Sequence, residues 1–223
     1  EPILPLYQQC GVAVGVQTVA AGGLHKFMDY EGFILTDSGG FQVLSLSDLR
    51  EVDDQGVTFR SHLDGSKHRL TPESVIAVQA ALGSDAWTTL DECPPYPCSE
   101  AEAARALDRT MRWTDRSVPA VAAARAGGSQ CLFFPLYQGG LHPNLRKRSA
   151  EHHNGLPADG ISIGGFMVGE SKDQTWSMLV ETTALLREER PRYLMGVGTP
   201  LDLWDAVACG VDMMDCVYPT RVA

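Results

Sequence analysis

The stretch FILTDSGGFQ at residues 33–42 joins an apolar, strand-like run to a polar turn that begins at Asp37. The two glycines after Ser38 have no side chain, so the backbone of this turn can come close to a ligand. Near the other end of the chain, the apolar run VDMM at residues 211–214 ends in the same way at Asp215. Two carboxylates at strand ends indicate an enzyme that uses carboxylate chemistry. Asp37 taken alone is also typical of a residue that opens a turn.

Strand-like runs recur along the chain and alternate with helix-like stretches, which is typical of a parallel α/β fold. The runs occupy residues 32–36, 85–90, 131–137, 160–163, 192–197 and 211–214. Nearly every run ends in a polar residue or a glycine turn. These ends are Asp37, Asp91, Gln138, Gly164-Gly165, Gly196-x-Gly198 and Asp215.

Polar groups at so many strand ends favour a (β/α)8 TIM barrel, because catalytic residues of that fold collect at the carboxyl ends of its strands. A doubly wound sheet gathers its ligands mainly at one switch point. The length of 223 residues, with 44% hydrophobic content and no linker, predicts a single catalytic domain over residues 1–223. Within it, residues 57–70 alternate polar and apolar around Asp64-Gly65, which predicts an inserted β-hairpin.

Short local signals mark the expected helix boundaries. They are N-caps at Thr71-Pro72 and Thr199-Pro200, capping boxes at Ser99-x-x-Glu102 and Ser171-x-x-Gln174, and stops at Gly83 and Gly210. The Ala-rich helix that begins after Ser99 contains Pro119. Proline removes a hydrogen bond from a helix interior, so we expect this helix to end or kink there.

The chain has a formal net charge of -10, which disfavours non-specific attachment to nucleic acid, because such binding depends on Lys and Arg neutralising phosphates. A nucleic-acid partner would have to meet a local basic face or further chain. The compact basic cluster Arg146-Lys147-Arg148 lies on a predicted helix. We interpret this cluster as a solvated helix face rather than a phosphate contact.

Six cysteines are scattered along the sequence, and no long apolar span accompanies them. This pattern is typical of reduced thiols, and it predicts a cytoplasmic protein that does not enter a membrane. Cys93 and Cys98 are separated by a four-residue gap, but no second Cys or His pair at zinc-site spacing answers them. We therefore expect no metal site and no cofactor in this chain.

Several strand-end residues are individually suited to binding or catalysis. Asp215 lies in a strongly apolar setting, where a carboxylate needs a partner or a purpose because its burial is costly. The amide of Gln138 can donate and accept hydrogen bonds in one plane, which suits a planar heterocycle. Asp91 precedes a proline-rich loop, and a capping role is a strong alternative for it. Gly164-Gly165 could offer main-chain N–H groups to a ligand, although such a pair is most often a turn.

Six motifs resemble those of the bacterial tRNA-guanine transglycosylases, also called queuine tRNA-ribosyltransferases. They are DSGGFQV at 37–43, DECPPYP at 91–97, QGG at 138–140, the GG..VGE run at 164–170, YLMGVGTP at 193–200 and DCVYPTR at 215–221. The motifs occur in the family's order, and the resemblance extends from about Ala21 to the last residue.

The resemblance implies a base exchange in the tRNA anticodon loop, in which 7-aminomethyl-7-deazaguanine, a queuosine precursor, replaces the wobble guanine. Asp215 would be the nucleophile that forms a covalent ribosyl-enzyme intermediate, as in retaining glycoside chemistry. Asp37 would act as general acid and base. The implied partners are tRNA and the guanine and 7-deazaguanine bases, and a homodimer is a further candidate assembly.

The resemblance also implies which residues recognise the base. Asp91 would accept from the donor edge of guanine, while Gln138 and the N–H of Gly165 would donate to its carbonyl. Phe41 and Met195 resemble the pair that sandwiches the ring. Glu170 resembles the glutamate that sets the geometry of the recognition loop. Cys93 and Val168 match positions that shape the subpocket for the 7-substituent.

The sequence departs from the family pattern at several places. Phe166-Met167 stands where Leu-Ala is usual, which predicts a bulkier wall near the 7-substituent, and Pro135 is unusual inside a strand. The family's zinc site would lie beyond Arg221 and its first strands before Glu1, so we expect a chain truncated at both ends that forms an adduct only when extended. An archaeal-type transglycosylase that uses another deazaguanine, a non-catalytic tRNA-binding subunit and an inactive fragment are the alternatives.

Overall fold

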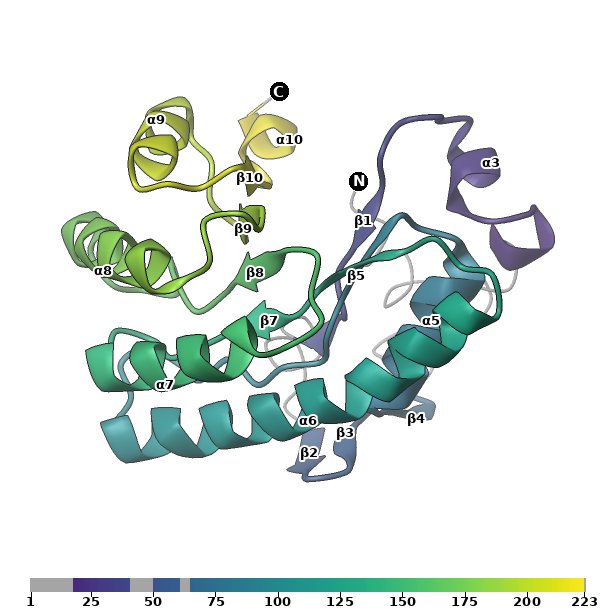
Figure 1. Ribbon diagram of the computed structural model, residues 1–223, viewed down its shortest axis with the longest axis horizontal. Coiled ribbons are helices and arrows are strands. Elements are labelled where there is room, and N and C mark those ends of the chain that lie inside the picture. The colour runs from purple at the N-terminus through teal and green to yellow at the C-terminus, as the bar shows by residue number, and fades with distance from the viewer. Residues whose placement is uncertain (1–17, 41–49, 61–64, 223) are drawn as a thin grey trace. The chain divides into compact units, whose positions relative to one another are not determined.

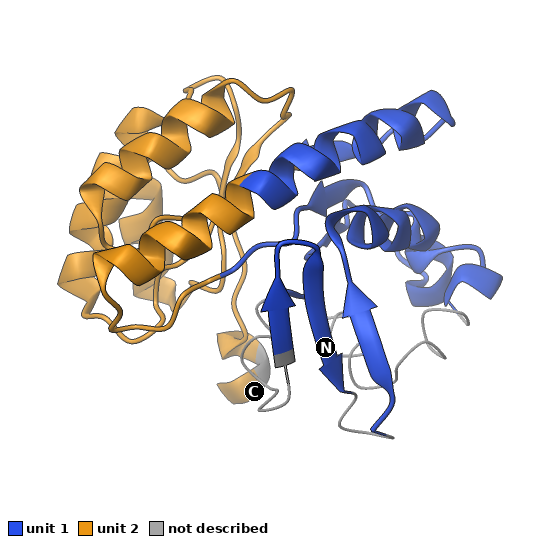
Figure 2. Ribbon diagram, turned by 90° about the horizontal axis from the view of Figure 1, so that it is seen from below, with its two compact units in different colours: residues 1–92, 112–133 blue, residues 93–111, 134–223 orange. Residues whose placement is uncertain are grey.

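The computed structural model describes residues 18–40, 50–60 and 65–222 of the chain, and it shows a mixed α/β protein with parallel strands (Figure 1). Two compact units are present. The first contains residues 1–92 and 112–133, and the second contains residues 93–111 and 134–223 (Figure 2). Among the described residues, the first unit contains two sheets and the second contains one, and each unit has its own buried apolar side chains.

The first unit is built around a sheet whose strand order is β1-β5-β6. Strand β1 (Leu35–Thr36) runs parallel to β5 (Ala86–Thr88), and β6 (Leu132–Phe134) follows β5 in the order. Helix α3 (Leu24–Met28) precedes β1, and α5 (Pro72–Leu82) precedes β5. All three side chains of β5 are buried, which is expected of a strand covered on both faces.

An antiparallel sheet of three strands also belongs to the first unit. Strand β3 (Gly56–Arg60) pairs with both β2 (Arg50–Asp53) and β4 (Lys67–Leu70). The β3–β4 pair falls on the range 57–70 where the sequence predicts a hairpin, and its connection at 61–64 lies outside the described residues. Strand β2 lies outside that predicted range.

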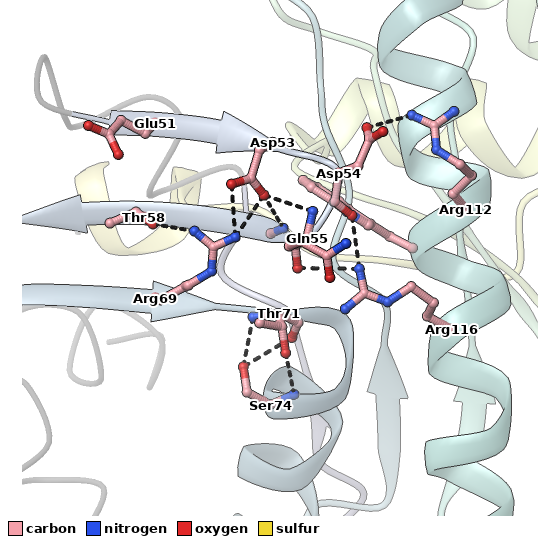
Figure 3. Close-up of polar contacts among 12 residues, drawn as sticks. Glu51, Asp53, Asp54, Gln55, Thr58, Arg69, Thr71, Ser74, Arg112 and Arg116 are labelled. Atoms are coloured by element: carbon pink, nitrogen blue, oxygen red, sulfur yellow. Dashed lines mark hydrogen bonds and ion pairs between the residues drawn. The ribbon is translucent and has the colours of Figure 1, made fainter.

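Ion pairs connect the strands of this sheet to each other and to neighbouring helices of the first unit (Figure 3). Arg69 donates to both carboxylate oxygens of Asp53, at 2.7 and 2.9 Å. Arg112 donates to the Asp54 carboxylate at 2.7 Å, and Arg116 forms a two-bond ion pair with Glu73. The side chains of these pairs are partly or largely exposed to solvent, and solvent screening weakens each ion pair.

The second unit contains a parallel sheet whose strand order is β10-β9-β8-β7. Its strands are β7 (Leu136–Tyr137), β8 (Ile161–Ile163), β9 (Arg192–Leu194) and β10 (Met213–Met214). The described helices that lie wholly within this unit are α7 (Pro143–Asn154), α8 (Lys172–Leu185), α9 (Pro200–Ala208) and α10 (Tyr218–Val222). The core includes Ile161, Ile163, Leu179 and Leu194, each at most 1% exposed.

The predicted helix caps are confirmed. Thr71 and Ser171 each accept from the main-chain N–H three residues later and complete reciprocal capping boxes with Ser74 and Gln174. Thr199 forms the same box at the start of α9, and Ser99 and Glu102 bond to each other before α6 (Glu100–Ala126). Gly83 ends α5 in the left-handed conformation, as predicted.

Of the two outcomes expected at Pro119, an end or a kink of the helix, the structure contradicts the end. Helix α6 continues through the proline to Ala126, over 27 residues (Figure 2). Trp113, Ser117 and Val121 are buried on both sides of the proline and pack this part of the helix into the first unit. Packing therefore outweighs the hydrogen bond lost at the proline.

Pro135 interrupts the run predicted over residues 131–137, so that β6 and β7 are separate strands in different sheets. Its carbonyl still accepts a hydrogen bond from the N–H of Ser162 at 3.1 Å. Within the described ranges, no helix is both long enough and apolar enough to cross a membrane.

Candidate functional site

Asp37 follows directly after β1 in the first unit, where it accepts a hydrogen bond from the hydroxyl of Thr88 at 3.2 Å. The glycine turn that follows lies against Asp91. A Cβ atom placed on Gly40 would stand 3.0 Å from both the main-chain oxygen and Oδ1 of Asp91. Asp91 is only 2% exposed. The structure therefore brings Asp37, Gly40 and Asp91 together at the ends of two parallel strands, while Phe41 lies outside the described residues.

A buried amide bonds the two strands that end near Asp37 and Asp91. The Gln79 side chain on α5 accepts from the hydroxyl of Thr36 and from the N–H of Thr88, both at 2.9 Å, and it donates to the Thr88 carbonyl at 2.9 Å. All three residues are at most 5% exposed. Because a buried amide with several hydrogen bonds has few alternative orientations, it fixes the strands that precede Asp37 and Asp91.

Gln138 and the Gly164-Gly165 turn form a second group, in the second unit. Gln138 follows β7 and is 2% exposed, and the two glycines follow β8. A Cβ atom on Gly164 would stand 2.6 Å from Nε2 of Gln138, and one on Gly165 would stand 2.4 Å from Oε1. Gly165 also has a φ of 75°. Only glycines allow the amide to lie so close to this turn.

Glu170 organises the loop that follows Gly165. Its carboxylate accepts from the N–H groups of Met167 and Val168, at 2.5 and 3.0 Å, and from the hydroxyl of Thr175 at 2.7 Å. Burial raises the pKa of the Glu170 carboxyl, but the hydrogen bonds from Thr175 and the main chain outweigh it and hold that pKa below its usual range. Met167 has a φ of 56°, a conformation rare for a residue with a side chain.

Asp215 follows β10, and its surroundings differ from those expected. The sequence predicts an apolar setting, whereas the residue is exposed and its Oδ1 accepts from the Tyr193 hydroxyl at 2.7 Å and from the Gly196 N–H at 2.8 Å. Among the described residues, no hydrogen bond reaches Oδ2. Met195 lies between the two donors in sequence and is half-buried. The carboxylate is thus oriented through one oxygen while the other stays available.

Arg146 corrects a second expectation. The sequence interpretation placed the 146–148 cluster on a solvated helix face, but Arg146 is 0% exposed. Its guanidinium stacks on the ring of Phe166, with 4.1 Å between the guanidinium carbon and the ring centroid. The helix register could have revealed this, because Arg146 shares the buried face of α7 with Ser149, Ala150 and His153. Phe166 packs into the hydrophobic core of the second unit. The bulky ring predicted for the wall near the 7-substituent therefore lies in this core.

A cavity of about 290 Å³ adjoins the second group. Gly165, Val168 and Glu170 line one part of it. The remaining lining residues are Pro94, Pro95, Tyr96, Pro97, Cys98, Gly140, Leu141, His142 and Gln174. Cys93, which the resemblance places at the subpocket, is half-buried beside Pro94. The volume is close to the lower limit of about 300 Å³ for small-molecule sites.

No part of the chain that the structure describes gathers three or more His, Cys, Asp or Glu side chains in a set that could hold a metal ion. The described residues therefore do not fit a zinc site.

The geometry defines an α/β protein in which carboxylates, an amide and glycine turns stand at the carboxyl ends of parallel strands. The chain matches the family model described as queuine tRNA-ribosyltransferase over residues 6–223. It belongs to that family.

Individual relatives agree with the family match. A queuine tRNA-ribosyltransferase of Desulforudis audaxviator is 53% identical over 203 residues, which cover 91% of this chain and 54% of the relative. That of Dehalococcoides mccartyi is 51% identical, over 91% of this chain and 50% of the relative. The queuine tRNA-ribosyltransferase of Koribacter versatilis is 46% identical, over 98% of this chain and 58% of the relative. The chain thus spans about half the length of these curated relatives.

Proposed function

We propose that this chain contributes the catalytic site of a tRNA-guanine transglycosylase, a pentosyltransferase that exchanges a base in tRNA. The observation that carries the proposal is the setting of Asp215. Its carboxylate stands at a strand end and is held through Oδ1 by two donors, while no residue that the structure describes bonds Oδ2. The family match over residues 6–223 supports the same assignment.

In the proposed first step, Oδ2 of Asp215 attacks the anomeric carbon of the ribose at the wobble position. The glycosidic bond to guanine breaks, and its electron pair stays on the departing ring nitrogen. Asp37, in its protonated form, gives a proton to the departing base. The product is a ribosyl ester of Asp215 and free guanine.

In the second step, 7-aminomethyl-7-deazaguanine takes the place of guanine. Asp37, now ionised, removes the proton from the ring nitrogen of this base, and that nitrogen attacks the anomeric carbon. The ester bond breaks, and Asp215 recovers its carboxylate. Because two displacements occur in succession, the configuration at the anomeric carbon is retained.

Base recognition in this proposal uses both groups of residues. Asp91 accepts from the donor edge of the base, and Gln138 and the N–H of Gly165 donate to its carbonyl. Phe41 and Met195 enclose the ring, and Glu170 holds the loop that meets the 7-substituent. Such a site rejects bases that lack the matching edge, because its buried polar groups would then be left without partners.

We further propose that the parallel strands belong to a (β/α)8 barrel forming a single catalytic domain. The partner is the anticodon loop of tRNA, the setting is the cytoplasm, and a homodimer is the proposed assembly. A zinc site in longer relatives would use residues outside this chain.

The test is to trap the ribosyl adduct. The protein is incubated with tRNA that carries labelled guanine at the wobble position, and the mixture is run on a denaturing gel. With an extended chain we expect a tRNA–protein band that Asp215→Asn abolishes, and with the 223-residue chain alone we expect no band. Asp212→Asn is the matched control, because Asp212 is exposed and its carboxylate accepts from the Arg192 N–H outside the proposed site.

Retention of the band in Asp215→Asn would contradict the nucleophile assignment. Binding of tRNA with no adduct in any variant would instead support a non-catalytic subunit. Release of the labelled guanine without incorporation of 7-aminomethyl-7-deazaguanine, when that base is supplied, would support a relative that uses another deazaguanine.

A further inference from the structure

Arg146 is a buried cation whose hydrogen-bond acceptors are main-chain carbonyls. Its Nε donates to the carbonyl of Gly140 at 2.8 Å, and its Nη2 donates to that of Gly164 at 3.0 Å. Longer contacts of 3.5 Å reach the carbonyls of Tyr137 and Gly165. Within the described part of the chain, no carboxylate forms an ion pair with Arg146. One guanidinium thus joins the turns after β7 and β8.

The cost of burying this cation indicates that it serves a purpose. Burial lowers the pKa of Arg146 to about 10, so the side chain remains charged at neutral pH. Burial also raises the pKa of Tyr137 to about 12, which keeps that neighbouring phenol neutral. An apolar residue would fill the same volume without the desolvation penalty. A planar guanidinium, however, can bond to carbonyls on two turns at once.

The bond to Gly164 has a direct consequence for Gly165. The carbonyl of Gly164 and the N–H of Gly165 belong to one trans peptide, so they point in opposite directions. When Nη2 of Arg146 holds that carbonyl, the N–H of Gly165 must point away from the guanidinium. Gly165 lines the cavity. The same side chain bonds Gly140, another lining residue, on the turn that carries Gln138.

We propose that Arg146 is a positioning residue that fixes the direction of the Gly165 N–H and thereby sets recognition of the carbonyl at C6 of the base. This inference rests on the proposed function for the identity of the ligand. It assigns Arg146 no contact with the base. Its effect passes through the peptide between Gly164 and Gly165.

A purely structural role would have a different signature from a positioning role. If Arg146 only stabilised the fold, its loss would weaken binding of every base alike. If it orients the Gly165 N–H, its loss should weaken guanine, which has the C6 carbonyl, more than 2-aminopurine, which lacks it. Hypoxanthine keeps the carbonyl and lacks the 2-amino group, so the preference for guanine over hypoxanthine should not change.

The experiment compares three variants with the unsubstituted protein. Arg146→Lys keeps the charge and removes the planar fork, and Arg146→Met keeps the length and removes the charge. Arg148→Lys is the matched control, because Arg148 lies on the same helix and pairs with Asp108 at the surface. Equilibrium dissociation constants for guanine, 2-aminopurine and hypoxanthine are measured by calorimetric titration without tRNA.

We expect both Arg146 variants to lose roughly tenfold in the preference for guanine over 2-aminopurine, as for one lost hydrogen bond. The preference for guanine over hypoxanthine should stay within about twofold, and the Arg148 control should match the unsubstituted protein. An unchanged preference for guanine over 2-aminopurine in a folded Arg146 variant would overturn the inference.

A nuclear magnetic resonance measurement separates this inference from the proposed function. In the variants, the amide signals of Gly164 and Gly165 should move even without a base. Unmoved signals would overturn the inference whether or not guanine binds. In the unsubstituted protein, added guanine should shift the Gly165 amide, and binding that leaves this signal unchanged would also overturn it. If the protein binds no guanine, the proposed function fails, and the amide signals of the variants still decide the role of Arg146.

Discussion

The hydroxyl of Thr88 lies 3.2 Å from Oδ1 of Asp37 and 3.3 Å from the main-chain oxygen of Thr36. A hydroxyl has one proton, so it can donate to only one of these acceptors at a time. An ionised carboxylate is the stronger acceptor. We therefore expect the hydroxyl to bond Asp37 when the carboxyl is ionised and to turn to Thr36 when it is protonated. The Thr88 hydroxyl can therefore keep a hydrogen-bond acceptor whether Asp37, the proposed general acid and base, is protonated or ionised.

Replacing Thr88 with valine should change the pH dependence of the proposed base exchange. Thr88→Val keeps the shape of the side chain but removes the donor that favours ionised Asp37. The carboxyl should then hold its proton to higher pH. We expect the acidic limb of the rate profile to move to higher pH, because a hydrogen bond to the ionised form is lost. Initial rates of guanine incorporation between about pH 4 and pH 9 measure this.

Thr89→Val is the control for that substitution. Thr89 is the next residue, is equally buried, and has its hydroxyl 3.4 Å from the hydroxyl of Thr114. A shift of the acidic limb in the Thr89 variant, or none in the Thr88 variant, would refute the assigned contact.

Tyr193→Phe should slow the proposed reaction without weakening base binding. The phenol donates one of the two hydrogen bonds to Oδ1 of Asp215 at 2.7 Å, and phenylalanine keeps the buried ring. Loss of one orienting bond should lower kcat by roughly tenfold. Single-turnover formation of the adduct measures this step. Tyr30→Phe, at an exposed position outside the site, should leave the rate unchanged, and an equal loss in both variants would contradict the role of Tyr193.

Glu170→Gln should destabilise the protein at neutral pH and have little effect in acid. The folded-state pKa of Glu170 lies below its ordinary value, which is the value expected in the unfolded chain. Stabilisation by the ionised carboxylate is therefore complete above that unfolded value and is lost as the pH falls through the folded-state pKa. After allowance for solvent screening, we expect a loss of about 1 kcal/mol in the free energy of unfolding at neutral pH.

Urea unfolding at pH 7 and at about pH 3 tests this dependence on protonation. Glu181→Gln, on the exposed face of α8, is the control and should change stability at neither pH. A difference between the Glu170 variant and the unsubstituted protein that persists in acid would show that the carboxylate charge is not responsible.

Gly165→Ala should abolish guanine binding while leaving most of the protein folded. The new Cβ atom would stand 2.4 Å from Oε1 of Gln138, at a φ of 75°. Gly83→Ala is the matched control, because its φ is 69° and a Cβ there meets nothing within 4 Å. Both variants should lose roughly 1–2 kcal/mol of stability from the left-handed backbone. Only the Gly165 variant should lose binding in a calorimetric titration, and equal binding by both would exclude the close contact with Gln138.

Short-range signals in the sequence predicted the structure well. The caps at Thr71, Ser171 and Thr199 depend on residues three positions apart, so the sequence alone contains both partners. The strand ends at Asp37, Asp91, Gln138 and Gly165 were also found from local patterns. These features need no knowledge of distant contacts.

Features that depend on distant packing could not be predicted in the same way. Helix α6 passes through Pro119 because buried neighbours hold it. Asp215 is exposed and receives its bonds from Tyr193 and Gly196, about twenty positions earlier. Arg146 is charged and lies in a basic triplet, yet it is buried and donates hydrogen bonds to main-chain carbonyls in the turns after two strands. In each case the deciding partner is far away in the sequence.

The amide of Gln79 has a consequence for how the first unit acquires its structure. It joins α5 to the main chain of Thr88, only nine positions along the chain. Closing so short a loop costs little conformational entropy, and contacts between near neighbours in sequence speed folding. Strand β1 joins β5 across about fifty positions. We therefore expect helix α5 and strand β5 to nucleate together, with β1 and its aspartate added to a preformed edge.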